Sequence, residues 1–302
     1  MDPQRSDDID ELNQATVAFL GVRPRLFGIA YRMLGTAAEA EDIVQEVWLR
    51  WQSTDRSVVR DATALLVTTT VRLAINLAQS ARSRHETYIG PWLPEPVDTA
   101  ADPTLGAERG EALELAVLIL LEKLLPNERA AYVLREAFDY SYSDIADILQ
   151  LTESNTRQLV TRARKHITDE RRAQVSSSEH RRLLEAFLAA AQKADISALK
   201  EIFTEDIVSI TDGGGILGAA RIPVLGRERV AKFIATFSSR FWADWTVTRV
   251  QVNGQPAALI RNKGIAYALV AIDVSPQGIG QILWVMSPAK LAVISQASSQ
   301  SL

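Results

Sequence analysis

Hydrophobic residues follow two different spacings along this chain. Through residues 7–88 and 109–172 they recur every three or four positions, which predicts amphipathic helices. Residues 180–203 read as a further pair of amphipathic helices. Beyond them, short runs such as "DIVSI", "WTVTRVQV" and "GQILWVM" alternate between apolar and polar positions, and Asn253-Gly254 between two runs predicts a hairpin. We therefore expect helical modules first and a separate α+β domain in the last third.

Turn and cap residues mark where several of these elements begin and end. Gly35 follows "YRML" and is a candidate for the left-handed residue after a helix C-terminus. Thr36 and Glu39 have the spacing of a capping box at the start of the next helix. Ser143 is the expected N-cap of a helix over "SDIADILQ". Residues 89–108 carry four prolines and predict a linker between two helical modules.

The helix expected over "AAEAEDIVQEVWLRW" has two faces. Glu39, Asp42 and Glu46 are spaced at i, i+3 and i+7 and form an acidic stripe. The apolar face consists of Ile43, Val44, Val47, Trp48 and Trp51. A stripe of this kind is most often an ordinary solvated face, so by itself it does not identify a binding site.

Residues 143–167 have the pattern of a helix-turn-helix: "SDIADILQ", the turn "LTE", then "SNTRQLVTRARKHI". The inner face of the second helix gathers Leu159, Val160, Ala163 and Ile167. Its outer face gathers Ser154, Arg157, Gln158, Thr161, Arg162 and Lys165. Arg and Gln side chains bond guanine and adenine edges in the major groove, and cations contact phosphates. The pattern therefore favours a DNA-recognition helix, although a solvated basic face is the simpler alternative.

The charge is unevenly distributed. The chain of 302 residues has a net charge of −4, yet residues 183–302 hold 11 Lys+Arg and 9 Asp+Glu. The remaining residues hold 22 and 28, so the part with the helix-turn-helix is the acidic part. Contacts with nucleic acid must come from local basic patches, and the acidic surplus suggests a second, basic partner.

Composition restricts the remaining function classes. The absence of cysteine excludes disulfides and thiolate chemistry and suits a reducing cytoplasm. The N-terminus "MDPQRSDDIDELN" is acidic and polar, which is wrong for a signal peptide. No apolar run reaches the roughly 18–20 residues that a membrane span requires. We expect a cytoplasmic protein with no membrane partner.

Taken together, these segments resemble a bacterial sigma factor of the extracytoplasmic-function (ECF) class. "YRMLGTAAEAEDIVQEVWLRW" resembles region 2 of that family, and "LPNERAAYVLREAFDYSYSDIADILQLTESNTRQLVTRARKHI" resembles region 4. The resemblance implies that region 2 docks on core RNA polymerase and opens the −10 promoter element, whereas region 4 reads the −35 element. It also accounts for the acidic surplus, because a sigma factor needs acidic surface for a basic polymerase site.

Three short motifs resemble marks of the ECF subgroup that carries a SnoaL-like C-terminal domain: "GPWLPEP" at 90–96, "DGGG" at 212–215 and "SPAKL" at 287–291. The last is similar to the subgroup's Asn-Pro-Asp-Lys-Leu motif, with Ser287 and Ala289 in place of Asn and Asp. Ile216 stands where the subgroup usually has Lys. A regulatory contact that uses the replaced polar side chains is therefore not expected to form here in the same way. Alternatively, "WLPEP" is only a spacer.

The resemblance implies a fold class and module boundaries. The expected chain is multidomain, with two all-α sigma modules, the second containing the helix-turn-helix, followed by an α+β SnoaL-like cone-shaped domain. The expected boundaries are 8–88 for region 2, 89–108 for the linker, 109–174 for region 4 and 179–296 for the SnoaL-like domain.

The resemblance also assigns sites. The polymerase-binding set is Glu39, Asp42, Gln45 and Glu46. The −10 set is Arg72, Asn76, Arg82 and Arg84, beside the loop "QSTDRSVVRDA" that would hold a flipped base. The −35 set is the outer face of the helix at 154–167. A regulatory contact would join Trp92, Leu93 and Pro94 to Asp212, Gly213, Gly214 and Gly215.

SnoaL-like domains enclose a pocket, and some relatives are enzymes with an acid/base pair. The histidines here are His85, His166 and His180, so none lies beyond residue 180. A lone Asp212 without a partner base is weak evidence for catalysis. We expect no catalytic residues, no metal and no cofactor. Four aromatic residues either line a pocket for a small-molecule ligand or belong to the core: Trp242, Trp245, Tyr267 and Trp284.

Two rival functions remain. A ligand-sensing helix-turn-helix regulator would also pair DNA binding with a pocket domain, but it has no use for the acidic helix or a separate region 2. A SnoaL-type enzyme fused to a DNA-binding arm would need an acid/base pair, and the absence of histidine from the C-terminal part counts against it. The preferred hypothesis is a sigma factor whose own C-terminal domain packs on the linker and on region 2 and regulates it.

Overall fold

The computed structural model of this chain describes residues 3–86, 88–99, 113–171, 173, 175–216, 219–241 and 245–297. Side chains are described within these ranges except at 3–12, 81–86, 238–241, 293 and 295–297. Contacts divide the chain into two compact units. The first comprises Met1–Arg84, Thr104–Ala112 and Leu120–Ile167, and the second comprises His85–Pro103, Leu113–Ile119 and Thr168–Leu302. These units are not the sequence modules expected above, whose boundaries stay a prediction.

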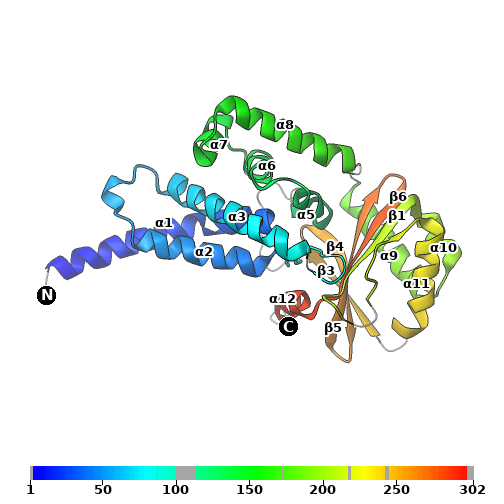
Figure 1. The fold of residues 1–302 in the computed structure, drawn as a ribbon. Helices are drawn as coiled ribbons and strands as arrows, with labels where there is room; N and C mark the ends of the chain where they lie inside the picture. The colour runs from blue at the N-terminus through cyan, green and yellow to red at the C-terminus, as the bar shows by residue number, and fades with distance from the viewer. Residues whose placement is uncertain are drawn as a thin grey trace. The chain divides into compact units, whose positions relative to one another are not determined.

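The first unit is helical (Figure 1). Its elements are α1 (Pro3–Leu34), α2 (Ala37–Gln52), the short helix η1 (Arg56–Val58), α3 (Ala62–Glu86), α6 (Pro126–Tyr132), the π-helical turn η3 (Val133–Ala137), α7 (Tyr142–Leu149) and α8 (Glu153–Glu170). Helix α5 (Leu115–Glu122) begins in the second unit and ends in the first.

Helices α1 and α2 pack through the apolar stripe that the sequence predicts. Ile43, Val44, Val47 and Trp51 are buried, and Trp48 packs against Phe19 with ring centroids 4.9 Å apart. The indole N–H of Trp51 is satisfied by the carbonyl of Ala15 at 2.9 Å. This bond matters because a buried donor without a partner costs about 1–3 kcal/mol.

The turn between α1 and α2 is partly as expected. Gly35 has a left-handed φ of +68° and its amide donates to the Tyr31 carbonyl at 2.7 Å, which confirms it as the residue after the helix C-terminus. The capping box at Thr36 was a wrong prediction, because the Thr36 side chain makes no capping hydrogen bond. The backbone carbonyl of Thr36 accepts a hydrogen bond from the Ala40 amide at 3.1 Å, which is the first hydrogen bond of the helix.

Helix α1 also contacts the α6–η3 segment within the first unit. Arg129 is buried, and its Nη1 donates to the Met33 carbonyl at 2.6 Å and pairs with Glu122 at 2.7 Å. Arg32 is buried too and lies over the Phe138 ring at 5.1 Å. The C-terminal turn of α1 is thereby tied to α6 and to the residue that follows η3, about 100 residues later in the sequence.

The second unit contains a six-stranded sheet of order β2-β1-β6-β5-β4-β3. Its elements are α9 (Ser177–Gln192), α10 (Ile196–Ile202), β1 (Phe203–Asp212), β2 (Val224–Leu225), α11 (Arg227–Phe241), β3 (Trp245–Val252), β4 (Gln255–Asn262), β5 (Ile265–Ser275), β6 (Gly278–Val285) and α12 (Pro288–Ala297). Strands β1 and β6 pair in parallel, and the other neighbours pair antiparallel. The Asn253-Gly254 hairpin is confirmed, with both residues at positive φ between β3 and β4.

Both faces of the sheet are covered. Helices α9, α10 and α11 lie on one face and bury a core with Phe187, Phe203 and Ile282 (Figure 1). On the other face α12 contacts β5, and the alternate residues Leu269 and Leu283 are buried as well. Since alternate residues of a strand point to opposite faces, a sheet covered on both sides has apolar residues in nearly every position. This is why "IAYALVAIDV" is almost continuously apolar.

The linker belongs to this second unit. Leu93 and Val97 are buried, and the Val97 amide donates to the Asn253 side chain at 3.0 Å. The Asn253 amide returns a bond to the Val97 carbonyl at 3.0 Å, and Asn253 Nδ2 donates to the Leu113 carbonyl at 2.9 Å. The hairpin predicted as a simple turn is therefore also an anchor for the linker.

We predict that His180 makes the second unit sensitive to acid. Burial lowers the pKa of its imidazole from 6.5 to about 4, and Nε2 has no hydrogen-bond partner among the described residues. Between pH 6.5 and about 4 the unfolded chain binds a proton that the folded chain does not. The free energy of unfolding should therefore fall with pH across this window, by on the order of 3 kcal/mol.

Urea unfolding at pH 7.5 and pH 5 tests this expectation. A His180→Leu variant should lose less stability between the two pH values than the unchanged protein. His166→Gln is the matched control, because His166 is exposed on α8. Equal pH dependence in all three proteins would contradict the assignment.

Candidate nucleic-acid interface and linker contact

Helices α7 and α8 form the predicted helix-turn-helix, with one correction at its start. The N-cap of α7 is Ser141 and not Ser143. Ser141 Oγ accepts from the Asp144 amide at 3.1 Å, and the Asp144 carboxylate accepts from the Ser141 amide at 3.2 Å. This reciprocal pair is a capping box with Asp in the third position, so it satisfies the Ser141 and Asp144 amides together.

The recognition helix α8 presents the predicted faces. Leu159, Val160, Ala163 and Ile167 are buried, as expected. All six residues of the −35 set are exposed: Ser154, Arg157, Gln158, Thr161, Arg162 and Lys165. The structure therefore places the six on one accessible face. Their contact with DNA stays a prediction.

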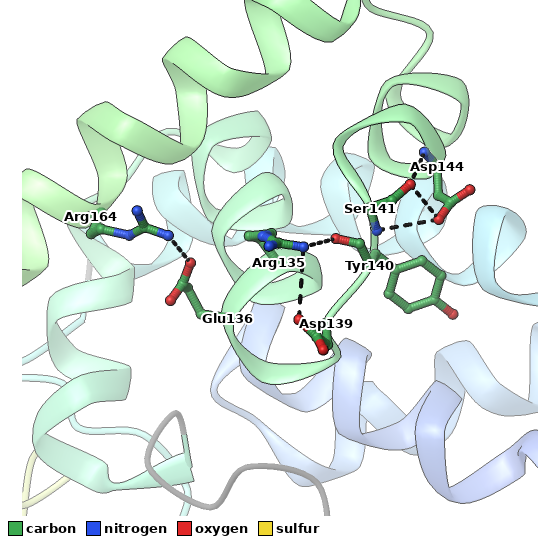
Figure 2. A network of polar contacts seen from close by, with 7 residues as sticks. All are labelled: Arg135, Glu136, Asp139, Tyr140, Ser141, Asp144 and Arg164. Carbon is green, nitrogen blue, oxygen red and sulfur yellow. Dashed lines mark hydrogen bonds and ion pairs between the residues drawn. The ribbon is translucent and has the colours of Figure 1, made fainter.

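A polar network holds α8 against the preceding helices (Figure 2). Arg164 pairs with Glu136 at 2.6 Å, and this hydrogen bond raises the pKa of the guanidinium. Arg135 donates to the Tyr140 carbonyl at 2.8 Å and lies 3.7 Å from the Asp139 carboxylate. The network thus fixes the loop before α7 and the middle of α8, so that the exposed face has a defined orientation within its unit.

Two arginines of the exposed face already have partners. Arg157 pairs with Glu153 at 2.5 Å and lies over the Tyr142 ring at 4.4 Å. Arg162 lies 3.5 Å from the buried Glu128. Both members of the Arg157–Glu153 pair are exposed, and such a pair contributes about 0–1 kcal/mol, so DNA phosphates or bases can replace Glu153 at small cost.

The polymerase-binding set divides between two shallow grooves on α2. Asp42 and Glu46 line a groove beside α3, together with Asn76 of the −10 set. Gln45 lines another groove beside α1, with Trp48 and Arg23. Glu39 is half-buried near the start of the helix. The structure therefore brings Asp42, Glu46 and Asn76 together but places Gln45 on the other side of the helix.

The −10 set is only partly described. Arg72 and Asn76 are exposed on α3, whereas the side chains of Arg82 and Arg84 lie outside the described residues. The loop before α3 is held by two carboxylates: Asp55 accepts from the Ser57 amide and Asp61 from the Ala64 amide, each at 3.0 Å. Hydrogen bonds to Ser57 lower the pKa of Asp55, so the first of these caps is charged at neutral pH.

The linker contact is built around Asp212, which is fully buried at the end of β1. Its Oδ1 accepts from the Tyr88 hydroxyl at 2.6 Å and from the Gly214 amide at 3.2 Å. Its Oδ2 accepts from the Leu93 amide at 2.9 Å and pairs with Lys290 Nζ at 2.6 Å. We call Asp212, Lys290, Tyr88 and the Leu93 backbone the clasp. Four bonds to one carboxylate explain how a buried charge is tolerated here.

Lys290 and Tyr88 are the two clasp residues that the predicted regulatory set did not include. Lys290 makes further contacts with the linker. Its ammonium also donates to the Leu93 carbonyl and lies 4.4 Å from the Trp92 ring centroid and 5.5 Å from that of Tyr88. Burial and the bond to Asp212 raise the pKa of the Tyr88 hydroxyl, so it donates at any ordinary pH. The signal for Lys290 was the Lys in "SPAKL", which lies in the first turn of α12.

The "DGGG" segment makes the close turn that the clasp requires. Gly214 and Gly215 have positive φ, as expected for this turn. A Cβ on Gly213 would lie 2.3 Å from that of Ala219, so no larger residue fits. Ile216 donates its amide to the Gly213 carbonyl at 3.1 Å, and Ser287 donates its amide to the Asp212 carbonyl at 3.1 Å. Two of the three departing positions, Ile216 and Ser287, therefore contribute backbone hydrogen bonds to this turn.

Trp92 and Pro94 flank Leu93 in this contact, with Trp92 half-buried and Pro94 buried. The predicted residues of the linker and of "DGGG" are thus brought together within the second unit. Their regulatory role stays a prediction. In the described part of the chain, no group of three or more His, Cys, Asp or Glu could hold a metal ion. No helix there is both long and apolar enough to cross a bilayer.

Comparison with known proteins agrees with this geometry. The family described as "Sigma-70 region 2" matches residues 19–84, and "Sigma-70, region 4" matches residues 114–167. The ECF RNA polymerase sigma factor SigJ of Mycobacterium tuberculosis (strain ATCC 25618 / H37Rv) is 37% identical over 229 residues, which cover 74% of this chain and 73% of that protein. A probable ECF RNA polymerase sigma factor, SigI of M. tuberculosis (strain CDC 1551 / Oshkosh), is 30% identical over 283 residues, covering 91% and 94%.

A solved structure extends the similarity to the C-terminal sheet. The crystal structure of the M. tuberculosis extracytoplasmic function sigma factor SigJ has a TM-score of 0.74 and 31% identity to this chain, covering 92% of this chain and 98% of that one. Helical sigma regions followed by an α+β sheet domain are therefore shared over almost the whole chain. The chain belongs to the family of ECF RNA polymerase sigma factors, in the subgroup with a C-terminal SnoaL-like domain.

Proposed function

We infer that this protein binds core RNA polymerase and directs promoter-specific initiation of transcription. The observation that carries this function is the presence of both sigma regions on one chain, with a helix-turn-helix whose outer face is accessible. A ligand-sensing regulator without polymerase binding is not favoured, because it has no use for region 2. Sigma factors are not enzymes and act on polymerase in the cytoplasm, so we propose the same for this protein.

We propose that the exposed part of α2 docks on the polymerase. Asp42 and Glu46 supply negative charge at one groove, and Gln45 supplies an amide at the next. Complementary charge steers association and sets the register of the complex. Glu39, nearer the start of α2, extends the same acidic stripe.

The promoter contacts follow from the two exposed basic surfaces. Arg157, Gln158 and Arg162 would read base edges of the −35 element, with Lys165 on phosphate. The loop before α3, whose Val58 is exposed, would receive the flipped base of the −10 strand. Arg72 and Asn76 on α3 would then contact the backbone of that strand, together with Arg82 and Arg84.

The C-terminal domain is proposed to regulate the sigma regions through the linker. The clasp ties the linker to the sheet by bonds at Leu93, and the hairpin ties it again at Val97. The linker joins region 2 to region 4, so the domain can limit how far these regions separate on polymerase.

Run-off transcription with purified core polymerase tests the function. The full chain and a truncation ending near Arg172 would be compared on a selected promoter library. Promoter-specific transcripts from the full chain support the sigma function, and the change on truncation gives the sign of the regulation. An absence of transcripts together with an absence of binding to core polymerase would contradict it.

We predict that Arg157→Ala weakens promoter recognition by about 1–3 kcal/mol and relaxes the preference at one base pair of the −35 element. Lys165→Ala should weaken all promoters alike. Open-complex formation by the reconstituted holoenzyme on matched promoters measures both effects. Arg182→Ala is the control, because Arg182 makes a similar exposed pair with Glu179 outside the helix-turn-helix. Unchanged promoter preference in Arg157→Ala would refute the assignment.

A further inference from the structure

The second unit contains an apolar cavity between α11 and the sheet. A water molecule can occupy about 60 Å3 of it, and the wider hollow that includes the part open to solvent measures about 560 Å3. Three of the four aromatic residues singled out in the sequence line it: Trp245, Tyr267 and Trp284. Trp242 lies outside the described residues. Phe233 and Phe237 of α11 form the opposite wall.

The aromatic walls of this cavity are held in place by contacts of their own. Trp245 and Tyr267 meet edge to face with centroids 4.5 Å apart, and Phe233 and Phe237 do the same at 4.8 Å. The indole N–H of Trp284 donates to Ser209 Oγ at 3.1 Å. These rings are only half-buried, so a bound apolar molecule would remove their remaining surface from water without rearranging them.

The lining defines the chemistry of the molecule that fits. Among the described residues that line the cavity, none carries a charge. Thr211 and Tyr267 supply hydroxyl groups, and the rest of the described lining is aliphatic or aromatic. A charged ligand would lose its hydration without gaining an ionic partner, which is costly in an apolar site. A neutral, flat molecule of one or two rings suits the walls, because rings stack on or against fixed aromatic faces.

The cavity shares its backbone with the clasp. Thr211 lines the cavity, and the next residue, Asp212, holds the linker. Met286 lines the cavity too, and its amide donates to the Asp212 carbonyl at 2.7 Å, while Ser287 begins the turn into α12 and Lys290. A molecule that presses on Thr211 and Met286 therefore acts directly on the two chain segments that carry the clasp.

We propose that this cavity is a binding site for a compact, neutral aromatic ligand and that its occupancy tightens the clasp on the linker. Ligand contacts order Thr211 and Met286, so the bond from the Leu93 amide to Asp212 opens less often. The site would make the regulation proposed above responsive to a small molecule.

Binding is tested on the full chain without polymerase, using 1-naphthylamine, a neutral two-ring probe whose fluorescence shifts to shorter wavelength in apolar surroundings. We expect saturable binding that becomes about tenfold weaker or more in Ala220→Trp, which fills the cavity from its rim. Ile222→Trp adds the same ring at an exposed position of the same loop and should bind as before. Ala268→Met, which narrows the cavity from β5, replaces Ala220→Trp if that variant does not fold.

The charge requirement is tested with the sulfonated analogue of the same probe, which we expect to bind at least about tenfold more weakly. Equal binding of the two probes, or equal binding to the cavity-filling variant, would show adsorption to general apolar surface and overturn the proposal.

Coupling to the clasp is tested by hydrogen exchange. Saturating neutral probe should slow exchange of the Leu93 amide about threefold or more. The Asn253 amide, which bonds to the far end of the linker at Val97, should slow less. Unchanged or faster exchange at Leu93, or equal slowing at both amides, overturns the coupling. The binding and hydrogen-exchange measurements use no polymerase. A negative result in them would therefore refute the ligand site without bearing on the sigma function, which run-off transcription tests.

Discussion

Asp212→Ala is expected to lower the free energy of unfolding of the second unit by about 3–5 kcal/mol. The change removes one partner of a buried ion pair and leaves the Lys290 ammonium, with a side chain only 11% exposed, without a counterion. It also removes the acceptor of the Leu93 amide and of the Tyr88 hydroxyl. Urea unfolding followed by tryptophan fluorescence measures the loss, because Trp284 and Trp245 lie in this unit.

Two controls separate the clasp from an ordinary ion pair. Glu185→Ala breaks the exposed pair of Glu185 with Arg249 and should cost at most about 1 kcal/mol. The double variant Asp212→Ala/Lys290→Met removes both charges, so it should recover part of the loss. An Asp212→Ala variant no less stable than Glu185→Ala would show that the clasp does not stabilise the domain.

Reversing the charge of α2 should have the largest effect on function. Asp42→Arg/Glu46→Arg places two cations where the proposed polymerase contact needs anions, and like-charge contact costs several kcal/mol. We expect binding to core polymerase to weaken at least about 100-fold, as measured by co-elution and by competition with an unchanged sigma factor. The fold should survive, because both residues lie on the solvent side of the helix and the Glu46–Arg50 pair contributes little.

The matched control is Glu201→Arg/Glu205→Arg, which makes the same change of net charge at two exposed acids of the second unit. It should leave polymerase binding unchanged apart from a general effect of charge. Equal loss in both double variants would mean that net charge, and not the acidic stripe of α2, governs the association.

The sequence by itself determined the features that depend on local spacing. The burial of Ile43 and Val47, the exposed face of α8 and the Asn253-Gly254 hairpin all follow from periodicity and turn chemistry over a few residues. The resemblance to the family also predicted the contact between the linker and the turn at 212–215, because the motifs "WLPEP" and "DGGG" are each short and contiguous in the sequence.

Local sequence signals misidentified the side-chain caps at the starts of α2 and α7. Thr36 has the spacing of a capping box but makes no side-chain bond, and Ser141 instead of Ser143 caps α7 because Asp144 can reciprocate. The loop before α7 is held by Arg135, which donates to the Tyr140 carbonyl and lies beside the Asp139 carboxylate.

Only the tertiary structure decided which segments, distant in the sequence, meet at the clasp and at the cavity. Lys290 joins the clasp because the parallel pairing of β1 with β6 brings the end of β6, and the α12 turn that follows, beside Asp212. The same pairing places Thr211 and Met286 on the cavity wall, and Asp212 of the clasp is the residue after Thr211. The hydrophobic pattern and the turns indicate the register of neighbouring hairpin strands, but the spacing of apolar residues within β1 does not show that β6, about 70 residues later, pairs with it.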